Sequence, residues 1–567
     1  MMGGYRGYRG IGKNSSPSIV THIKIIVRSD AKAVEALPRG SEHSFHLIRQ
    51  KNSASTNTRG DEMNKVRVLG LMCVLVIVTT VRCQLLPTFG IPKFPSDGYN
   101  FNKNDLEDGR LLLTPYIEAG LQSTARKLAK VDRSLFLNTT SYAGYLTVDE
   151  ERDSNLFFWF FPAEGSQRLL LSSGENDLDD EADAGETEDT DFDHEYLKKL
   201  SANETTNYGA DGKPVVLWLQ GGPGVSSLMA LFTENGPFFL DGTKLRDNPY
   251  SWHKKYHMLY IDNPVGTGFS FTSSDGYCET ITGVARHLYT GLVQFFKLFP
   301  SLQTNSFYIT GESFAGKYIP AIADVIYEQN GIPQNYLKIN LKGLALGNAL
   351  SDPYNMVDYS DFAYQLGLIG RKGYQEMKLT ESLIRAYIDQ PKLAKAYWDS
   401  TLHLFTVHSN YSNMYNIQEP ESMDLFPYKP FIDQPHIREA LHVGGHPFSG
   451  PNTVYTHLIN DFMTTAMHWT ERLLDAGLRI MYYNGNWDFI VAYPLSENAF
   501  HKMQWSGAED YKSATRRPFK VNGKLHGYVT KARNFYEVSI ISAGHMVPTD
   551  QPIACLTLID RFFTNKL

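Results

Sequence analysis

Short apolar runs recur along the chain from residue 141 onward, and most of them end at a Gly or an Asn. Longer amphipathic stretches separate these runs, such as residues 284–299, which show a helical period and stop at Pro300. This alternation is typical of a mostly parallel sheet covered by helices. The runs expected to form strands are residues 141–148, 155–161, 214–219, 257–262, 306–310, 341–346, 478–483 and 536–541, of which the first two read as an antiparallel pair.

The pattern changes between about residues 351 and 470. Helical stretches such as residues 375–388 alternate there with polar loops, and no clear strand is present. The simplest account is an inserted, mainly helical cap. The chain is therefore expected to be an α/β protein with a mixed, mostly parallel central sheet and a helical cap.

Two further segments stand outside this pattern. Twelve acidic residues lie between Glu175 and Glu195 without a single Lys or Arg. Like charges at this density repel one another, so we expect an acidic disordered loop over about residues 172–212, a surface insertion without a catalytic role. Residues 1–62 are rich in Ser, Gly, Asn and Arg and show no period, which indicates a disordered extension or a gene-model artefact.

Residues 63–83 read as a signal peptide. A 14-residue apolar run, residues 68–81, follows Lys65 and Arg67 and is short for a membrane-spanning helix. Cleavage near Cys83 would leave a mature domain of residues 84–567, and an uncleaved signal anchor is the alternative. A secretory route, ending in secretion or in the lysosome and without membrane attachment after cleavage, is also supported by glycosylation sequons at Asn138, Asn203 and Asn410.

Composition narrows the possible functions. The chain is 42% hydrophobic and 20% charged, as ordinary globular proteins are, and its net charge of −7 offers no basic surface for nucleic acid. Only Cys278 and Cys555 remain after the signal, so at most one internal disulfide can form, and no metal-ligand spacing is present.

Candidate chemistry lies after three of the expected strands. Residues 311–316 read Gly-Glu-Ser-Phe-Ala-Gly between a strand and a helix, which is the setting of a nucleophile elbow with Ser313 at its tip, although Ala315 departs from the strict G-x-S-x-G pattern. Asp488 and His545 follow later strands, in the chain order Ser, Asp, His that α/β hydrolases use. Because a serine hydroxyl needs an adjacent base to act as a nucleophile, these residues form a candidate triad.

Several long motifs in register extend this pattern. They are residues 216–227 (VLWLQGGPGVSS), 262–270 (DNPVGTGFS), 311–316, Gly347-Asn348 and 543–552 (AGHMVPTDQP). From residue 141 to the C-terminus the chain resembles the serine carboxypeptidases, nearest their vitellogenic carboxypeptidase-like branch. The resemblance implies an α/β-hydrolase fold, no cofactor or metal, and hydrolysis of the C-terminal residue of peptides or proteins through an acyl-enzyme intermediate.

The resemblance also assigns roles to single residues. It places the catalytic triad at Ser313, Asp488 and His545, and the oxyanion-hole N–H groups at Gly222 and Phe314. It places recognition of the substrate's terminal carboxylate at Trp218, Gln220, Gly221, Glu234 and Glu312, with Gln220 where the family usually has Asn. Two carboxyls in contact cannot both ionise cheaply, so the Glu pair should share a proton and favour activity at acidic pH.

Further residues are expected to line the pockets for the substrate's side chains. Met229 and Thr233 are expected beside the leaving residue, Ile490 and Val491 in the other pocket, and Met546 as added apolar surface. Three other functions stay open: acyl transfer to an alcohol or amine, a lipase or esterase, and a protein that binds and protects partner enzymes. The intact triad and carboxylate cluster favour a peptidase, and the oligomeric state, a homodimer included, is not fixed by the sequence.

Overall fold

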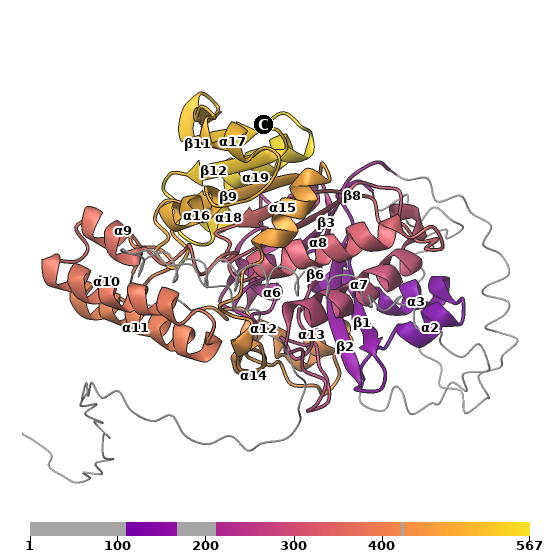
Figure 1. Ribbon diagram of the computed structural model, residues 1–567. Coiled ribbons are helices and arrows are strands. Elements are labelled where there is room, and N and C mark those ends of the chain that lie inside the picture. Colours follow the sequence, from indigo (N-terminus) through magenta and orange to yellow (C-terminus); the bar gives the residue numbers. More distant parts are fainter. Residues whose placement is uncertain (1–108, 167–210, 421–423) are drawn as a thin grey trace, which may run out of the picture. The chain divides into compact units, whose positions relative to one another are not determined.

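The computed structural model describes residues 109–166, 211–420 and 424–567 (Figure 1). The expected extension over residues 1–62, the signal peptide over residues 63–83, nearly all of the acidic loop and the sequon at Asn203 lie outside these residues. All candidate catalytic, oxyanion-hole, carboxylate-binding and pocket residues lie within the described ranges.

Ten of the twelve strands in the described residues form one central sheet. The strands are β1 (Tyr142–Asp149), β2 (Ser154–Phe161), β3 (Val215–Leu219), β4 (Phe238–Asp241), β5 (Lys244–Asp247), β6 (His257–Ile261), β7 (Phe307–Glu312), β8 (Leu341–Gly347), β9 (Arg479–Gly485), β10 (Arg517–Val521), β11 (Lys524–Ala532) and β12 (Phe535–Ile540). The sheet has the order β1-β2-β6-β3-β7-β8-β9-β12-β11-β10, and β4 and β5 form a separate hairpin. Neighbours from β6 to β12 pair in parallel and the outer strands pair antiparallel. The expected mixed, mostly parallel sheet is confirmed.

Every strand expected from the sequence overlaps an observed one, and the first two do pair antiparallel. Four strands were not expected: β4 and β5 of the separate hairpin, and β10 and β11, which form an outer hairpin of the central sheet. One face of this outer hairpin is exposed, as in the alternating burial of β11, so its apolar residues do not form a run. Asn522 and Gly523 form its turn with positive φ angles of 50° and 79°, the geometry that an Asn-Gly turn favours.

Helices connect and cover the strands (Figure 1). They are α2 (Thr114–Glu118), α3 (Gln122–Ala129), α6 (Leu228–Thr233), α7 (Ile281–Leu298), α8 (Ala315–Gly331), α9 (Tyr359–Gln365), α10 (Arg371–Ala386), α11 (Pro391–Ser409), α12 (Lys429–Ile432), α13 (Pro435–Ala440), α14 (Asn452–His457), α15 (Met467–Asp475), α16 (Tyr493–Phe500), α17 (Ala508–Lys512), α18 (Val547–Asp550) and α19 (Pro552–Phe563). Local chemistry sets their ends: Thr280 caps α7 by accepting a hydrogen bond from Gly283 N–H at 3.1 Å, and Pro300 follows its last turn.

Helices bury both faces of the sheet centre, which explains why β3 is a continuous apolar run. Val215, Leu217 and Leu219 belong to the hydrophobic cluster that also contains the buried residues of α7 and α8. Val216 and Trp218 point the other way and belong to the cluster formed with α6 and α19. All five residues of β3 are buried.

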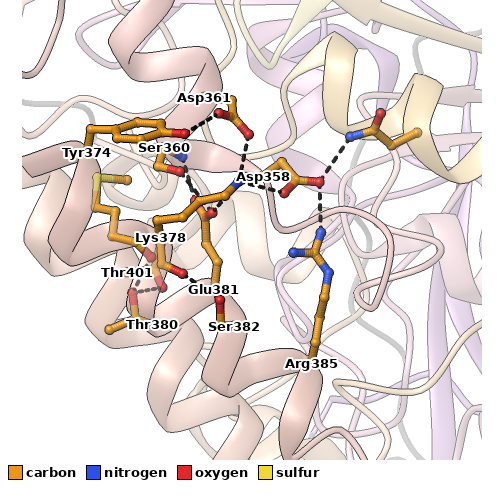
Figure 2. Close-up of polar contacts among 12 residues, drawn as sticks. Asp358, Ser360, Asp361, Tyr374, Lys378, Thr380, Glu381, Ser382, Arg385 and Thr401 are labelled. Carbon is orange, nitrogen blue, oxygen red and sulfur yellow. Dashed lines mark hydrogen bonds and ion pairs between the residues drawn. The ribbon is translucent and has the colours of Figure 1, made fainter. Parts of the chain in front are cut away.

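The segment between β8 and α15 is mainly helical, so the expected cap is confirmed, and α10 and α11 pack side by side with α9 next to them (Figure 1). Figure 2 shows the polar network that joins these helices. The buried Glu381 accepts hydrogen bonds from Ser360 N–H at 2.6 Å and Ser360 Oγ at 2.9 Å, which links α10 to α9. Thr401 Oγ1 on α11 donates to Thr380 Oγ1 on α10 at 2.7 Å.

A hydrogen bond from Tyr359, itself held by Trp398 within the cap, and a ring stack of Phe405 join the cap to the loop after β9. Tyr359 Oη donates to the carbonyl of Ile490 at 2.9 Å and accepts from Trp398 Nε1 at 3.0 Å. The ring of Phe405 stacks on that of Phe489 with 3.8 Å between centroids. The cap therefore fixes the loop that carries Asp488.

We expect Glu381→Ala to destabilise the cap. The change leaves the buried Ser360 N–H and hydroxyl without their acceptor, which should lower the free energy of unfolding by about 1–3 kcal/mol. Urea denaturation of the purified protein measures this as a lower midpoint. Glu509→Ala, which removes a side chain that is 85% exposed, is the matched control and should leave the midpoint unchanged. Equal midpoints for both variants would contradict the assigned role of Glu381.

Candidate active site

A cavity of about 270 Å³ opens where β3 and β7 end and the loops after β9 and β12 begin. Carboxyl ends of parallel strands are where α/β proteins place their ligand sites. Of the residues singled out from the sequence, those that line this cavity are Gln220, Gly221, Gly222, Met229, Glu312, Ser313, Phe314, Ile490, Val491, His545 and Met546. Trp218, Glu234, Asp488 and Thr233 are not among the described residues that line it.

Ser313 occupies a tight turn between β7 and α8. Its φ of 62° is unusual for a residue other than glycine, and its N–H donates to the carbonyl of Gly347 at 3.0 Å. The loop after β3 approaches this turn so closely that a Cβ atom at Gly221 would lie 2.6 Å from both Phe314 N and Ser313 Cβ. The glycine therefore allows the contact that holds the serine in the cavity wall.

His545 and Asp488 form a buried pair. His545 Nδ1 lies 2.8 Å from Asp488 Oδ2, and Asn348 Nδ2 donates to the same oxygen at 2.6 Å. Asp488 Oδ1 accepts from Val491 N–H at 3.3 Å. The Asp488 carboxylate therefore orients the imidazole, whose Nε2 is buried and has no partner within the described residues.

The loop of His545 is held by residues to which the sequence analysis gave no role. His545 N–H donates to the carbonyl of Tyr415 at 2.7 Å, and the two rings pack edge to face. Asp550 Oδ2 accepts from Gly544 N–H at 2.6 Å and from Asn416 Nδ2 at 3.0 Å. Tyr415 and Asn416 come from the segment after α11, so their contact with this loop could not be inferred from sequence spacing.

Two backbone N–H groups lie beside the serine. The loop after β3 supplies the N–H of Gly222, and the residue that precedes α8 supplies the N–H of Phe314. Within the described residues neither donates a hydrogen bond. Both residues line the cavity, so a negatively charged oxygen formed there would find donors in place.

A chain of buried polar groups leads away from the serine. Trp218 Nε1 donates to Gln220 Oε1 at 2.8 Å, which fixes the amide so that Gln220 Nε2 donates to Glu312 Oε1 at 2.7 Å. The same Nε2 lies 3.5 Å from Glu234 Oε1. Glu234 Oε2 and Glu312 Oε2 are both buried and have no partner among the described residues.

Burial raises the pKa of Glu234 and of Glu312, because a charged carboxylate is poorly solvated there. The nearby charge of Asp550 raises the pKa of Glu234 further, and the charges of Glu234 and Asp488 do the same for the pKa of Glu312. At acidic pH the cluster therefore carries carboxyl O–H donors.

The cap supplies a cavity wall that the sequence did not reveal. Four residues of α11 line the cavity and share one face of the helix, since they lie three, four and seven residues from the first: Lys395, Trp398, Asp399 and Leu402. Helical periodicity identifies such a face, but it does not tell what the face contacts.

Residues outside the cavity concern the expected glycosylation, disulfide, metal and membrane features. Asn138 and Asn410 are exposed, so their sequons are accessible for glycosylation, which stays a prediction. Cys278 and Cys555 are both free. Across residues 109–166, 211–420 and 424–567, no group of three His, Cys, Asp or Glu side chains could hold a metal ion, and no helix is long and apolar enough to cross a membrane.

Comparison with known proteins identifies the family. The sequence model of the family described as serine carboxypeptidase matches residues 202–565. The chain belongs to the serine carboxypeptidase family. It is a hydrolase that removes C-terminal residues from peptides, so the activity expected from the motifs is confirmed.

Several relatives support this assignment. The chain is 40% identical to the venom serine carboxypeptidase of Apis mellifera over 474 residues, covering 80% of this chain and 91% of the relative. It is 38% identical to the probable serine carboxypeptidase CPVL of Homo sapiens and 36% identical to the vitellogenic carboxypeptidase of Aedes aegypti, each covering 80% of this chain and 90% of the relative.

A solved structure confirms the fold. The prohormone-processing carboxypeptidase Kex1(Δ)p of Saccharomyces cerevisiae superposes with a TM-score of 0.64 at 23% identity, covering 78% of this chain and 96% of that one. The α/β-hydrolase fold expected from the sequence is therefore correct.

We expect Gly221→Ala to reduce carboxypeptidase activity strongly. The new methyl group would collide with Ser313 Cβ and Phe314 N and displace the turn, so kcat/KM should fall about a hundredfold, as when one oxyanion donor is lost. Hydrolysis of an N-blocked dipeptide measures the loss. Gly331→Ala, where no atom lies within 4 Å of the new Cβ, is the control. A Gly221→Ala enzyme within twofold of the control would show that the close approach is not required.

Proposed function

We propose that Ser313, Asp488 and His545 are the catalytic triad of this serine carboxypeptidase. The observation that carries the proposal is the 2.8 Å contact between Asp488 and His545 Nδ1, which leaves Nε2 for the serine that lines the same cavity. Ser313 Oγ attacks the carbonyl carbon of the last peptide bond while His545 Nε2 takes the hydroxyl proton. His545 then gives this proton to the departing amine, and an acyl-enzyme is left.

Water completes the cycle. His545 Nε2 takes a proton from a water molecule whose oxygen attacks the acyl carbon, and it returns the proton to Ser313 Oγ as the shortened peptide leaves. Each attack places a negative charge on the carbonyl oxygen. The N–H groups of Gly222 and Phe314 stabilise this charge, and their position beside Ser313 supports that role.

The carboxylate cluster selects peptide ends. In this proposal a protonated Glu234 or Glu312 and the amide of Gln220 donate hydrogen bonds to the substrate's terminal carboxylate. Trp218 fixes the amide, and Gly221 leaves room beside it. Support comes from the 2.7 Å bond between Gln220 and Glu312 and from the two buried oxygens of the Glu pair that have no partner in the described residues.

Apolar residues of the cavity and features of the sequence indicate the substrate side chains and the location of the protein. Met229 and Met546 line the cavity near the carboxylate cluster and are proposed to contact the leaving residue, with Thr233 behind Met229. Ile490 and Val491 line the same cavity and are proposed to form the other pocket. The apolar run at residues 68–81 and the exposed sequons support a secretory route, with secretion or delivery to the lysosome.

The decisive test uses two substrates that differ only at the C-terminus. The mature protein should release the last residue of an N-blocked dipeptide acid at about pH 5, where raised carboxyl pKa values keep the pair protonated. It should act weakly on the dipeptide amide, which lacks the carboxylate. Ser313→Ala should abolish release, and Ser400→Ala, at an exposed position of α11, should not. Equal rates on acid and amide would contradict the carboxylate cluster, and full activity of Ser313→Ala would contradict the triad.

Peptide affinity should also fall as pH rises. Because the raised pKa values keep a proton on the Glu pair at acidic pH, the donor is lost and a second negative charge appears as pH passes them. KM for the dipeptide acid should therefore rise with pH faster than KM for an ester without a free carboxylate. Glu234→Gln, whose amide donates at every pH, should flatten the difference. Parallel pH profiles for acid and ester in the wild type would refute this explanation.

A further inference from the structure

Helix α11 of the cap places two charged side chains in the cavity. Lys395 and Asp399 lie one helical turn apart and both line it, together with Trp398 and Leu402. Apart from the groups already given a role, most of the surrounding wall is apolar or aromatic. A charged pair in such a wall affects which substrates fit, because an unmatched polar group is costly to bury.

Lys395 is almost completely buried, with 3% of its surface exposed. Its Nζ lies 4.7 Å from the ring centroid of Trp398, 5.0 Å from that of Tyr455 and 4.7 Å from that of Phe462. Asp399 Oδ1 accepts a hydrogen bond from it at 2.5 Å, whereas the Asp399 side chain is 58% exposed. The cation therefore lies in the wall under three rings, with its counter-charge toward solvent.

The ammonium group has more donors than acceptors. A lysine side chain carries three N–H donors, and Asp399 is the hydrogen-bond acceptor found for Lys395 among the described residues. Aromatic faces attract the charge, but they are poor substitutes for an oxygen. A buried donor that lines a substrate cavity is satisfied when the substrate brings an acceptor to it.

The position of α11 shows which part of the substrate reaches Lys395. The carboxylate cluster and Met229 lie on the side of the cavity assigned to the leaving residue. Trp398 is joined through Tyr359 to Ile490, and Phe462 packs on Phe314 with 5.2 Å between centroids. Lys395 is thus linked through Trp398 and Tyr359 to Ile490, so we assign it to the side proposed for the residue that precedes the scissile bond.

We propose that Lys395 is a specificity-determining residue that recognises the penultimate side chain of the peptide and favours a neutral hydrogen-bond acceptor, Gln in particular. This inference rests on the proposed triad and carboxylate cluster, which set the direction of the substrate. An amide oxygen satisfies the ammonium without adding charge. A second carboxylate would meet the negative charge of Asp399, and a cationic side chain would meet Lys395 itself.

The test compares four N-blocked dipeptides with one C-terminal residue and Gln, Met, Glu or Lys before it. These side chains are all unbranched, so they differ mainly in polarity and charge. In the wild type, kcat/KM should be about tenfold higher for Gln than for Met, the size expected of one hydrogen bond to a charged group, and lowest for Lys. A Gln-to-Met ratio near one would overturn the proposal.

Two variants separate recognition from structure. Lys395→Met should bring the Gln-to-Met ratio to about one and raise activity on the Lys peptide, because Asp399 is then left without its cation. Asp399→Asn should move the preference from Gln to Glu. Lys392→Met, at an exposed position of the same helix, is the control and should keep the wild-type order. An equal loss on all four peptides in Lys395→Met, or an unchanged order in Asp399→Asn, would show that the pair is only structural.

Binding keeps this inference apart from the proposed mechanism. The affinities of Ser313→Ala protein for the same four peptides, measured by calorimetry with and without Lys395→Met, report recognition without turnover. A Gln preference that depends on Lys395 would support the inference even if the assigned roles of Asp488 and His545 proved wrong. Equal affinities for Gln and Met peptides would overturn it even if Ser313 proved to be the nucleophile.

Discussion

The approach of the loop after β3 to the turn after β7 is the contact on which the active site depends. Glycine at position 221 lets the backbone come within a distance that any side chain would prevent. Gly311, near the end of β7, has the same function, because a Cβ atom there would lie 2.1 Å from the carbonyl oxygen of Leu219. These contacts place the Ser313 hydroxyl, the N–H of Phe314 and the Gln220 amide together. The nucleophile and both sets of hydrogen-bond donors are thus positioned by backbone geometry before any substrate arrives.

Buried carboxyl groups serve two opposite purposes around this contact. Asp488 receives hydrogen bonds from Asn348, Val491 and His545, which fix its carboxyl group so that it orients the imidazole. Glu234 and Glu312 receive fewer hydrogen bonds than Asp488, and each has a carboxyl oxygen without a partner among the described residues. Carboxyl side chains therefore accept hydrogen bonds on one side of the serine, whereas on the other side burial raises their pKa and lets them act as donors. Hydrogen bonding and burial, more than residue identity, make the difference.

Much of this could be predicted from the sequence, and the exceptions have physical reasons. Central strands are buried on both faces and read as apolar runs. The hairpins β4–β5 and β10–β11 mix exposed and buried residues and were missed, although Asn522-Gly523 is a recognisable hairpin signal. The triad candidates were found because each follows a strand. The supporting roles of Asn348 and Tyr415, and the cavity-lining face of α11, depend on contacts between distant segments. Local periodicity carries no information about such contacts.

The contacts of the cap with Phe489 and Ile490 have an evolutionary consequence. The residues that shape the pocket and the loop that carries the catalytic acid share one packed aromatic cluster, formed with Tyr359, Trp398 and Phe405. Inserted segments are usually free to diverge, since they can change without disturbing the fold that holds them. In this protein the cap cannot diverge independently of catalysis. Changes to the cap wall that admit new peptides also alter the packing that holds the loop of Asp488. New specificities in this protein should therefore arise by exchange of side chains along α11 rather than by replacement of the whole cap.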